Sequence, residues 1–231
     1  MYLSLSFLVN KPKIGMTKKA IFWNDDIDAY YLGHQVSEIW RDRVYAPYLE
    51  DKHDLTILDI GANIGMFSLY AHKFAKQIYA LEPSLEHFQL LSDMLVFNNI
   101  ENVKPIRKAL YIKSGEFDFW HNPNKTMFSL HTAVSDGSKP EKVEAITLKQ
   151  LFDQEEITHV DLMKCDIEGT EVELFSGEAF AEVADKIDTI VVEVHDWNQR
   201  NPQQIVDAFK YRGFKVDKIP STANLLVAKR N

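Results

Sequence analysis

The stretch LTILDIGANIGMFSLYA, residues 55–71, joins an apolar run to a glycine-containing turn and then to a helix-like pattern. Its first six residues are mostly apolar and partly β-branched, which favours a strand. After Gly65, apolar side chains recur at the spacing of one helix face. A strand that runs through a turn into a helix is the repeating unit of a parallel sheet wrapped by helices. We therefore expect an α/β fold from about residue 55 onward.

The same alternation of strand-like and helix-like segments continues to the end of the chain. Further strands are expected at 77–83, 103–110, 159–167 and 188–195, and helices at 84–98, from 170 onward and at 202–214. Thr170 and Glu173 match a capping box, and Glu171 lies in the first turn, where a negative charge suits the helix dipole. The runs 214–219 and 223–230 flank a Pro-Ser-Thr turn and are expected to close the sheet as an antiparallel hairpin.

Two segments stand outside this pattern. Residues 1–54 are rich in aromatic side chains and partly helical, which suggests an extension that packs on the sheet or caps the substrate side. Residues 111–147 contain two β-like pieces, 117–120 and 143–146, separated by Asn, Pro, Ser and Gly, and are expected to form an inserted hairpin. The expected organisation is thus an N-terminal extension followed by one domain over 55–231.

The composition restricts the class of protein. The chain has 231 residues, of which 45% are hydrophobic and 26% charged, as in an ordinary globular domain. Its net charge of −8 argues against a broad nucleic-acid surface, which needs clustered Lys and Arg. A single cysteine, Cys165, excludes an internal disulfide, and we expect a cytoplasmic location. The sequence has no apolar run of the roughly 20 residues that a membrane-spanning helix needs.

The turn after residue 60 carries the first functional signal. A dinucleotide-binding turn needs Gly-x-Gly-x-x-Gly, but Asn63 and Met66 occupy the second and third glycine positions, which disfavours a nicotinamide or flavin cofactor. Asp59 at the strand end suits a ligand with an ammonium group instead. Glu82, at the end of the next strand, can accept hydrogen bonds from both hydroxyls of a ribose. The alternatives are glycines that only permit a tight turn and an exposed acid at residue 82.

The stretch DLMKCDIEGTE, residues 161–171, places charges in and after a strand of the expected core. Alternate residues of a strand share a face, so Lys164 and Asp166 point the same way, as do Glu193 and His195 of the neighbouring strand. We expect the two pairs to meet at the carboxyl ends of the strands, with Lys164 balanced by Asp166 and Glu193. Glu168 is expected to face solvent or substrate. The alternatives are a purely structural ion-pair network and a core histidine at 195.

Five stretches together resemble the FkbM family of S-adenosylmethionine-dependent methyltransferases. They are LDIGANIGMFSLYA, ALEPSLEHFQLL, NNIENVKPIRKAL, DLMKCDIEGTEVEL and VVEVH, between residues 55 and 195. The most specific of them is KCDIEGTE, placed after DIGANIG. The resemblance implies a seven-stranded Rossmann-like sheet with helices on both faces. It also implies methyl transfer, usually to oxygen on sugars or natural products.

The resemblance implies a set of residues that bind S-adenosyl-L-methionine. Asp59 and the turn that follows it would hold the methionine part, Glu82 the ribose hydroxyls, and the backbone near Lys108 the adenine. Apart from the resemblance, we expect Asp166 to lie beside the donor methyl group. The full set is Asp59, Gly61, Ala62, Asn63, Gly65, Glu82, Lys108, Ala109 and Asp166.

The expected catalytic residues are those of the charged cluster. Asp166 orients the acceptor, His195 is the better candidate for a base, Lys164 organises the site, and Glu193 tunes the base. The acceptor pocket is expected to draw on the insertion, although an ordinary hairpin is a close alternative. The insertion residues concerned are Trp120, His121, Asn124, Ser129 and His131.

No metal is expected in this site. Oxygen and nitrogen ligands are available from Asp166, Glu168, Glu193 and His195, but Lys164 in their midst would compete with a cation. The leading hypothesis is O-methylation of a small-molecule or saccharide acceptor. Methylation of a protein or nucleic acid is the alternative among enzymes, with nucleic acid disfavoured by the charge. A catalytically silent binding module is the alternative outside them.

Overall fold

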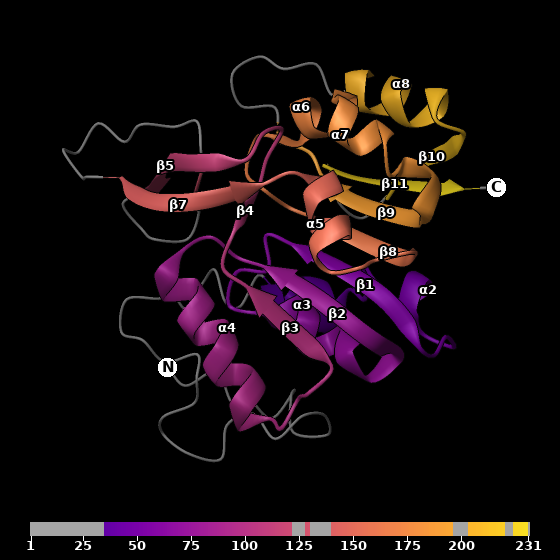
Figure 1. Ribbon diagram of the computed structural model, residues 1–231. Helices are drawn as coiled ribbons and strands as arrows, with labels where there is room; N and C mark the ends of the chain where they lie inside the picture. Colours follow the sequence, from indigo (N-terminus) through magenta and orange to yellow (C-terminus); the bar gives the residue numbers. More distant parts are fainter. Residues whose placement is uncertain (1–34, 122–127, 130–139, 196–202, 220–223, 231) are drawn as a thin grey trace.

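The computed structural model describes residues 35–121, 128–129, 140–195, 203–219 and 224–230. Its main feature is a seven-stranded sheet of order β10-β11-β9-β8-β1-β2-β3 (Figure 1). The strands are β1 Leu55–Ile60, β2 Ala75–Leu81, β3 Val103–Ile106, β8 Val160–Cys165, β9 Ile187–Glu193, β10 Phe214–Lys218 and β11 Leu225–Arg230. The expected seven-stranded α/β architecture is confirmed.

Five neighbouring strands of this sheet run parallel. β1 pairs in parallel with β2 and with β8, and the outer pairs β2–β3 and β8–β9 are also parallel. β11 is antiparallel to both β9 and β10, so the expected terminal hairpin is present. Because the parallel strands share one direction, their carboxyl ends meet at one edge, where ligands bind in open α/β sheets.

Helices cover both faces of the sheet. One apolar cluster joins the sheet to α5, α6, α7 and α8, whose bounds are Leu148–Gln154, Glu171–Ser176, Glu178–Ala181 and Gln203–Tyr211. A second cluster joins the other face to η2, α2, α3 and α4, whose bounds are Ser37–Arg41, Ala46–Leu49, Met66–Ala71 and Leu85–Phe97. Strand β1 contributes to both clusters, because Ile57 packs in the second and Leu58 in the first. Short 3-10 turns complete the connections at η3 His72–Phe74 and η4 Ala184–Lys186.

A smaller sheet projects from the domain and has the order β4-β7-β5-β6 (Figure 1). Its strands are β4 Ala109–Leu110, β5 Gly115–His121, β6 Phe128–Ser129 and β7 Glu141–Ile146. β5 and β7 pair antiparallel, so the two β-like pieces of the insertion lie side by side. The expected single strand at 103–110 is wrong, since β3 ends at Ile106 and β4 joins the smaller sheet.

Two further local expectations need correction. The apolar spacing in GMFSLYAHKFA predicts a helix over residues 65–75, but α3 ends at Ala71. The turn η3 then leads directly into β2, which begins two residues earlier than predicted. The capping box at Thr170 is also wrong, because the Thr170 side chain makes no capping hydrogen bond. Glu171 instead accepts hydrogen bonds from the backbone amides of Ile167 and Gly169.

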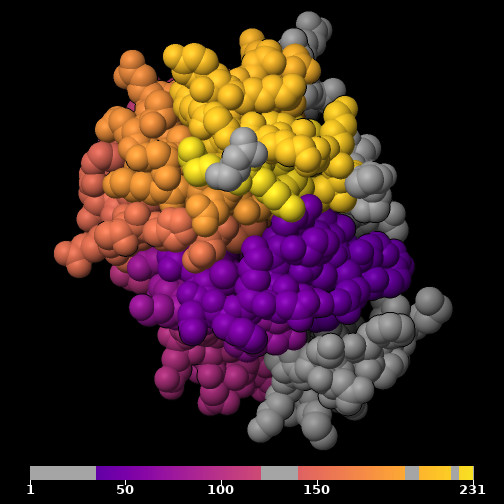
Figure 2. All heavy atoms as spheres, turned by 90° about the vertical axis from the view of Figure 1, so that its right-hand side faces the viewer, coloured from indigo at the N-terminus to yellow at the C-terminus, as the bar shows by residue number. Residues whose placement is uncertain are grey.

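The described part of the N-terminal extension packs on the domain. Tyr45 stacks edge-on against Phe67 of α3, with 4.8 Å between the ring centroids, and the Tyr70 hydroxyl donates to Glu50 over 2.7 Å. In the side view of Figure 2 the indigo N-terminal residues lie directly against the yellow C-terminal residues. Among the described helices, none has the length and apolar character that crossing a membrane would require.

Candidate active site

The charged residues of the sequence analysis gather where β1, β8 and β9 end. The parallel register sets Ile60 beside Cys165, and Cys165 beside Val192. The backbone amide of Asp166 then donates to the carbonyl of Ile60 over 3.0 Å, which extends the pairing one residue beyond the strand. Side chains that follow these strands are therefore held close together by the sheet.

Lys164 forms the buried part of this group. Its ammonium group donates to the Gly61 carbonyl over 2.6 Å and lies 3.5 Å from Asp59 Oδ1 and 3.7 Å from Asp166 Oδ2. Burial disfavours the charged form of Lys164, but the carboxylates of Asp59 and Asp166 outweigh it and raise the pKa of the ammonium. The expected partner Asp166 is present. The other close carboxylate is Asp59 rather than Glu193, which corrects the sequence-based pairing.

Asp59 is completely buried, and its carboxylate accepts a hydrogen bond from the Ser68 hydroxyl over 2.7 Å. Burial raises the pKa of Asp59, although Lys164 and Ser68 both act in the opposite direction. Sequence reasoning placed Asp59 next to a ligand. Its side chain contacts α3 and β8, and it holds the lysine that borders the strand ends.

His195 lies at the centre of three carboxylates. Its Nε2 atom is 3.4 Å from Glu168 Oε2, 3.8 Å from Glu193 Oε1 and 4.0 Å from Asp166 Oδ1. The expected meeting of the two residue pairs is thus observed. Glu168, which was expected to face solvent or substrate, is half-buried within this group. We call Asp166, Glu168, Glu193 and His195 the strand-end cluster.

Glu171 is a residue of the site that the sequence analysis placed only in the first turn of a helix, where its charge suits the helix dipole. It is completely buried, and its Oε1 atom lies 2.9 Å from His195 Nδ1. The same oxygen accepts hydrogen bonds from the amides of Ile167 and Gly169. Glu171 therefore fixes the imidazole so that Nε2 faces the other three carboxylates. The sequence signal was a third acid in DIEGTE, too close to a strand end to be an ordinary surface charge.

The protonation of the cluster follows from this crowding. Burial lowers the pKa of His195, but the hydrogen bond to Glu171 and the negative charge of Glu168 raise it overall, to about 9. Burial and the charge of Asp166 raise the pKa of Glu168 to about 8 and that of Glu193 to about 7. The raised pKa of His195 favours a protonated imidazole at neutral pH, whereas the sequence analysis expected this residue to act as a base.

Glu82 connects the ends of β2 and β1. It is 4% exposed, so the alternative of an exposed strand-end acid is wrong. Its carboxylate accepts hydrogen bonds from the backbone amides of Asn63 and Ser84, over 2.8 and 2.9 Å. Burial raises the pKa of Glu82 to about 7, although the two hydrogen bonds act to lower it. The carboxylate thereby fixes the turn that follows β1.

The two glycines of this turn are required by the protein's own packing. A Cβ atom on Gly61 would lie 1.8 Å from the carbonyl oxygen of Asp166. One on Gly65 would lie 2.5 Å from Leu91 Cδ1 and 2.6 Å from Met94 Cε, both in α4. Both glycines also have positive φ, 72° and 88°. The tight-turn alternative thus accounts for both residues without a ligand.

Most of the remaining predicted residues that the structure describes lie in or beside the smaller sheet. The Lys108 amide donates to the Ile106 carbonyl over 2.9 Å, and its ammonium group pairs with Glu144, while Ala109 is buried in β4. Trp120 and His121 belong to β5 and pair with Ser129 and Phe128 of β6. Asn124 and His131 are outside the described residues. Ala62 is buried in the turn after β1.

Tyr45 brings the N-terminal extension to the site, which the sequence did not indicate. It is 4% exposed, and burial together with the charges of Glu38, Asp166 and Glu193 raises the pKa of its hydroxyl well above the usual value. The ring is thus close enough to the strand-end cluster to sense its charge.

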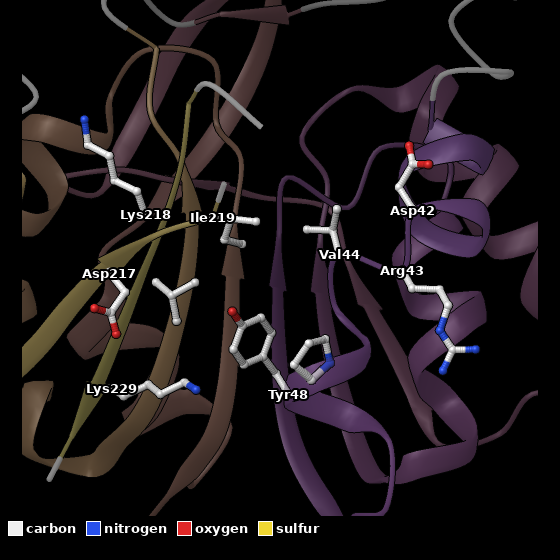
Figure 3. A pocket seen from close by; sticks show the side chains of 10 residues that line it. Asp42, Arg43, Val44, Tyr48, Asp217, Lys218, Ile219 and Lys229 are labelled. Atoms are coloured by element: carbon white, nitrogen blue, oxygen red, sulfur yellow. The ribbon is translucent and has the colours of Figure 1, made fainter. Parts of the chain in front are cut away.

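A separate pocket of about 280 Å³ lies between the extension and the terminal hairpin (Figure 3). Tyr48 projects into it from α2, opposite Lys229 of β11, whose ammonium group is 4.8 Å from the ring centroid. Arg43 at its rim pairs with Glu50. None of the residues that line this pocket belongs to the predicted site.

The strand-end cluster suits a positively charged ligand. Asp166 Oδ1 and Glu168 Oε2 are buried atoms that have no hydrogen-bond donor among the described residues. Buried carboxylate oxygens without donors are costly, and a nearby cation removes that cost. Together with Glu82 at the neighbouring strand end, these oxygens fit a ligand that carries an ammonium or sulfonium group and a ribose.

Similar proteins point to one family. The profile described as Methyltransferase FkbM domain matches residues 59–216. Hexuronic acid methyltransferase AglP of Haloferax volcanii is 28% identical over 178 residues, covering 72% of this chain and 70% of that protein. Methyltransferase sdnD of Sordaria araneosa is 26% identical over 211 residues, covering 75% of this chain and 81% of that protein.

Solved structures show the same architecture. Magnesium protoporphyrin IX methyltransferase (ChlM) from Synechocystis PCC 6803, with bound SAM, aligns with a TM-score of 0.54 at 14% identity, over 91% of this chain and 88% of that one. An rRNA methylase from Streptococcus thermophilus aligns with a TM-score of 0.51 at 13% identity, over 83% of this chain and 95% of that one. At these identities the likeness concerns the fold.

Proposed function

The chain belongs to the FkbM methyltransferase family, and from this premise we propose that it transfers a methyl group from S-adenosylmethionine to a hydroxyl group of a saccharide or small natural-product-like acceptor. The observation that carries the proposal is the strand-end cluster, which gathers acidic side chains at the ligand-binding edge of the sheet. The similarity to a hexuronic acid methyltransferase supports a sugar as the acceptor.

We assign the donor to the turn after β1 and to the strand ends beside it. S-adenosylmethionine, when bound, supplies an electrophilic methyl group on a positively charged sulfur. The carboxylate of Glu82 keeps a second lone pair on each oxygen for ribose hydroxyls, and it holds the Asn63 amide in place. Asp59 acts indirectly, because its carboxylate holds the ammonium group of Lys164 against the Gly61 carbonyl. Lys108 and Ala109 stay assigned to the adenine side.

We assign the chemical step to the strand-end cluster. Methyl transfer forms a bond from the acceptor oxygen to carbon, breaks the carbon–sulfur bond with its electrons left on sulfur, and releases the hydroxyl proton. The side chains of Asp166 and Glu193 are 25% and 33% exposed, whereas that of His195 is 9% exposed. The carboxylates can therefore touch the acceptor and take its proton. His195 and Lys164 organise them, and Asp166 orients the acceptor.

We assign the acceptor side to the N-terminal extension and the insertion. Tyr45 reaches the strand-end cluster from the segment 37–49, which forms one wall. Within the insertion, Trp120 lies on β5, which is one of the strands of the smaller sheet. In this organisation residues 55–231 form the methyltransferase domain, and the segments 1–54 and 111–147 shape its acceptor side.

The test is transfer of a labelled methyl group to defined acceptors. Purified protein is incubated with methyl-labelled S-adenosylmethionine and hexuronic acid glycosides, neutral sugars, a protein mixture or RNA. We expect label on a saccharide oxygen. Asp166→Asn should lower turnover at saturating S-adenosylmethionine by about a hundredfold. Asp188→Asn, in an exposed acid at the opposite end of β9, is the matched control. Label on protein or RNA alone, or no cofactor binding, would contradict the proposal.

A further inference from the structure

The strand-end cluster has the geometry of a divalent-cation site. The ligand atoms of Asp166, Glu193 and His195 lie within 4.8 Å of one another. The distances from His195 Nε2 are 3.8 Å to Glu193 and 4.0 Å to Asp166. Two donors that each lie about 2.1 Å from one ion are separated by roughly 3 to 4 Å. Three side chains from two strand ends are therefore already spaced to share one ion.

The reason for excluding a metal on the sequence alone does not hold in the structure. Lys164 was expected in the midst of the ligands. Its ammonium group instead lies on the Asp59 side, bonded to the Gly61 carbonyl, and it approaches Oδ2 of Asp166 at 3.7 Å. The other oxygen of Asp166, Oδ1, faces His195. The lysine and a cation would thus use opposite oxygens of the same carboxylate.

The imidazole is oriented as a metal ligand would be. Glu171 Oε1 binds Nδ1 of His195 at 2.9 Å, and Glu171 is itself held by two backbone amides. A carboxylate on one ring nitrogen fixes the tautomer and directs the other nitrogen toward a metal. His195 is 8% exposed, so the ring has little freedom to turn away.

The two buried oxygens described above, which suit a positively charged ligand, are also placed to bind a metal cation. Asp166 Oδ1 and Glu168 Oε2 are inaccessible to solvent and have no hydrogen-bond donor within the described ranges. Three carboxylates around one nitrogen repel each other unless a proton or a metal ion lies between them. A protonated His195 would offset this repulsion as an ion-pair partner. A divalent cation would offset it with a larger positive charge.

We propose that Asp166, Glu193 and His195 bind one divalent cation of the Mg²⁺ or Mn²⁺ class. Carboxylate-rich sites with one imidazole favour such ions over softer ones. In its role this inference rests on the proposed function: the ion draws the acceptor hydroxyl to the strand ends and lowers its pKa. When the ion occupies the carboxylates of Asp166 and Glu193, the remaining carboxylate of the strand-end cluster, Glu168, takes the hydroxyl proton in their place as the oxygen–carbon bond forms and the carbon–sulfur bond breaks.

The experiment measures Mn²⁺ binding directly. Full-length protein is treated with EDTA, dialysed and titrated with Mn²⁺ at pH 7.5, and free Mn²⁺ is followed by electron paramagnetic resonance. We expect one Mn²⁺ per chain, with at least tenfold weaker binding in Glu193→Gln and in Asp166→Asn. The matched control is Asp188→Asn, in the exposed group His159, Asp161 and Asp188, which is the other candidate cation cluster among the described residues. That variant should leave the tight site unchanged.

A fold control and a cofactor titration accompany the Mn²⁺ measurement. Thermal unfolding of both site variants checks that weaker binding is not loss of fold. No tight Mn²⁺, or loss only in Asp188→Asn, overturns the inference and leaves His195 as an imidazolium ion pair. Titration of the same samples with S-adenosylmethionine separates the two proposals. If S-adenosylmethionine binds but Mn²⁺ does not, only the cation site is contradicted. If Mn²⁺ binds but S-adenosylmethionine does not, the proposed function is contradicted and the cation site is retained.

Discussion

Lys164 is a buried ammonium whose charge is balanced by carboxylates from β1 and from the end of β8. Asp59 stands directly across from it in the parallel register. Removing one partner of a buried ion pair leaves an uncompensated charge, which typically costs about 3–5 kcal/mol. The pair therefore belongs to the stability of the sheet as well as to the site.

We predict that Lys164→Met lowers the free energy of unfolding by about 3–5 kcal/mol, because Asp59 is left buried without a cation. The double variant Asp59→Asn, Lys164→Met should recover part of this loss, since neither charge then remains. Urea unfolding of the wild type, both single variants and the double variant gives the coupling energy. Additive single effects would show that the pair does not interact.

If Glu82 binds the ribose as proposed, cofactor binding depends on pH. Its pKa is raised to about 7 by burial, with Lys164 acting to lower it and Asp59 to raise it. Only the carboxylate accepts hydroxyl hydrogen bonds through both oxygens. With a pKa near 7, its ionised fraction rises about tenfold between pH 6 and pH 8. We predict that S-adenosylmethionine binding tightens by a similar factor, and that Glu82→Gln removes the part due to this group. Calorimetric titration at several pH values measures it.

The same shift affects stability with the opposite sign. The folded pKa of Glu82, about 7, exceeds the ordinary value of 4.5, so the folded state binds more protons between these values. The contribution of this group to stability therefore falls as pH rises from about 4.5 through about 7. A wild-type stability profile that differs from that of Glu82→Gln in the other direction would contradict the assignment.

At the scale of elements, the contact between α3 and α4 depends on Gly65. This glycine precedes α3 with φ of 88°, and Leu91 and Met94 of α4 fill the space that a side chain would need. The sequence analysis considered a ligand as the reason for this glycine. The structure gives packing against α4 as the reason, because Leu91 and Met94 leave no room for a Cβ atom at this position.

We predict that Gly65→Ala lowers the free energy of unfolding by roughly 2–4 kcal/mol, through overpacking against Leu91 and Met94 and a positive φ. Gly169→Ala is the matched control, because its φ is also positive, 109°, and nothing lies within 4 Å of an added Cβ. Denaturant unfolding compares the two. An equal loss in both variants would show that the backbone angle alone matters.

At the scale of the whole molecule, the N-terminal extension folds with the domain. Leu49 of α2 is completely buried in the same apolar cluster as α3 and α4. Lys229 of the last strand lies over the Tyr48 ring, so α2 meets the terminal hairpin on this side of the sheet (Figure 2). The described part of the extension, from residue 35 onward, thus contributes to the core.

We predict that Leu49→Ala lowers the free energy of unfolding by about 2–5 kcal/mol and keeps a single cooperative transition. Val96→Ala, in a side chain that is 78% exposed, should change it by less than about 0.5 kcal/mol. Far-ultraviolet circular dichroism and tryptophan fluorescence in urea follow the transition. A biphasic curve for Leu49→Ala would show that the extension unfolds separately.

The sequence by itself determined the order of the elements and the acids at their ends. Alternating periods of two and 3.6 residues gave β1, α3, β2 and α4 in the right order, since each period reflects which side chains the core must bury. Asp166, Glu193 and His195 were also predictable as neighbours, because parallel strands carry their carboxyl ends to one edge. Local spacing failed at Thr170, where a buried carboxylate replaced the expected cap.

Only the tertiary structure decided which partners those side chains have. The register between β1 and β8 sets Lys164 beside Asp59, and the position of α6 sets Glu171 within hydrogen-bond distance of His195. Packing of α4 explained Gly65, and docking of the extension brought Tyr45 to the strand-end cluster. These contacts join residues distant in sequence, so no local periodicity encodes them. Their energies depend on burial and charge at the assembled edge of the sheet.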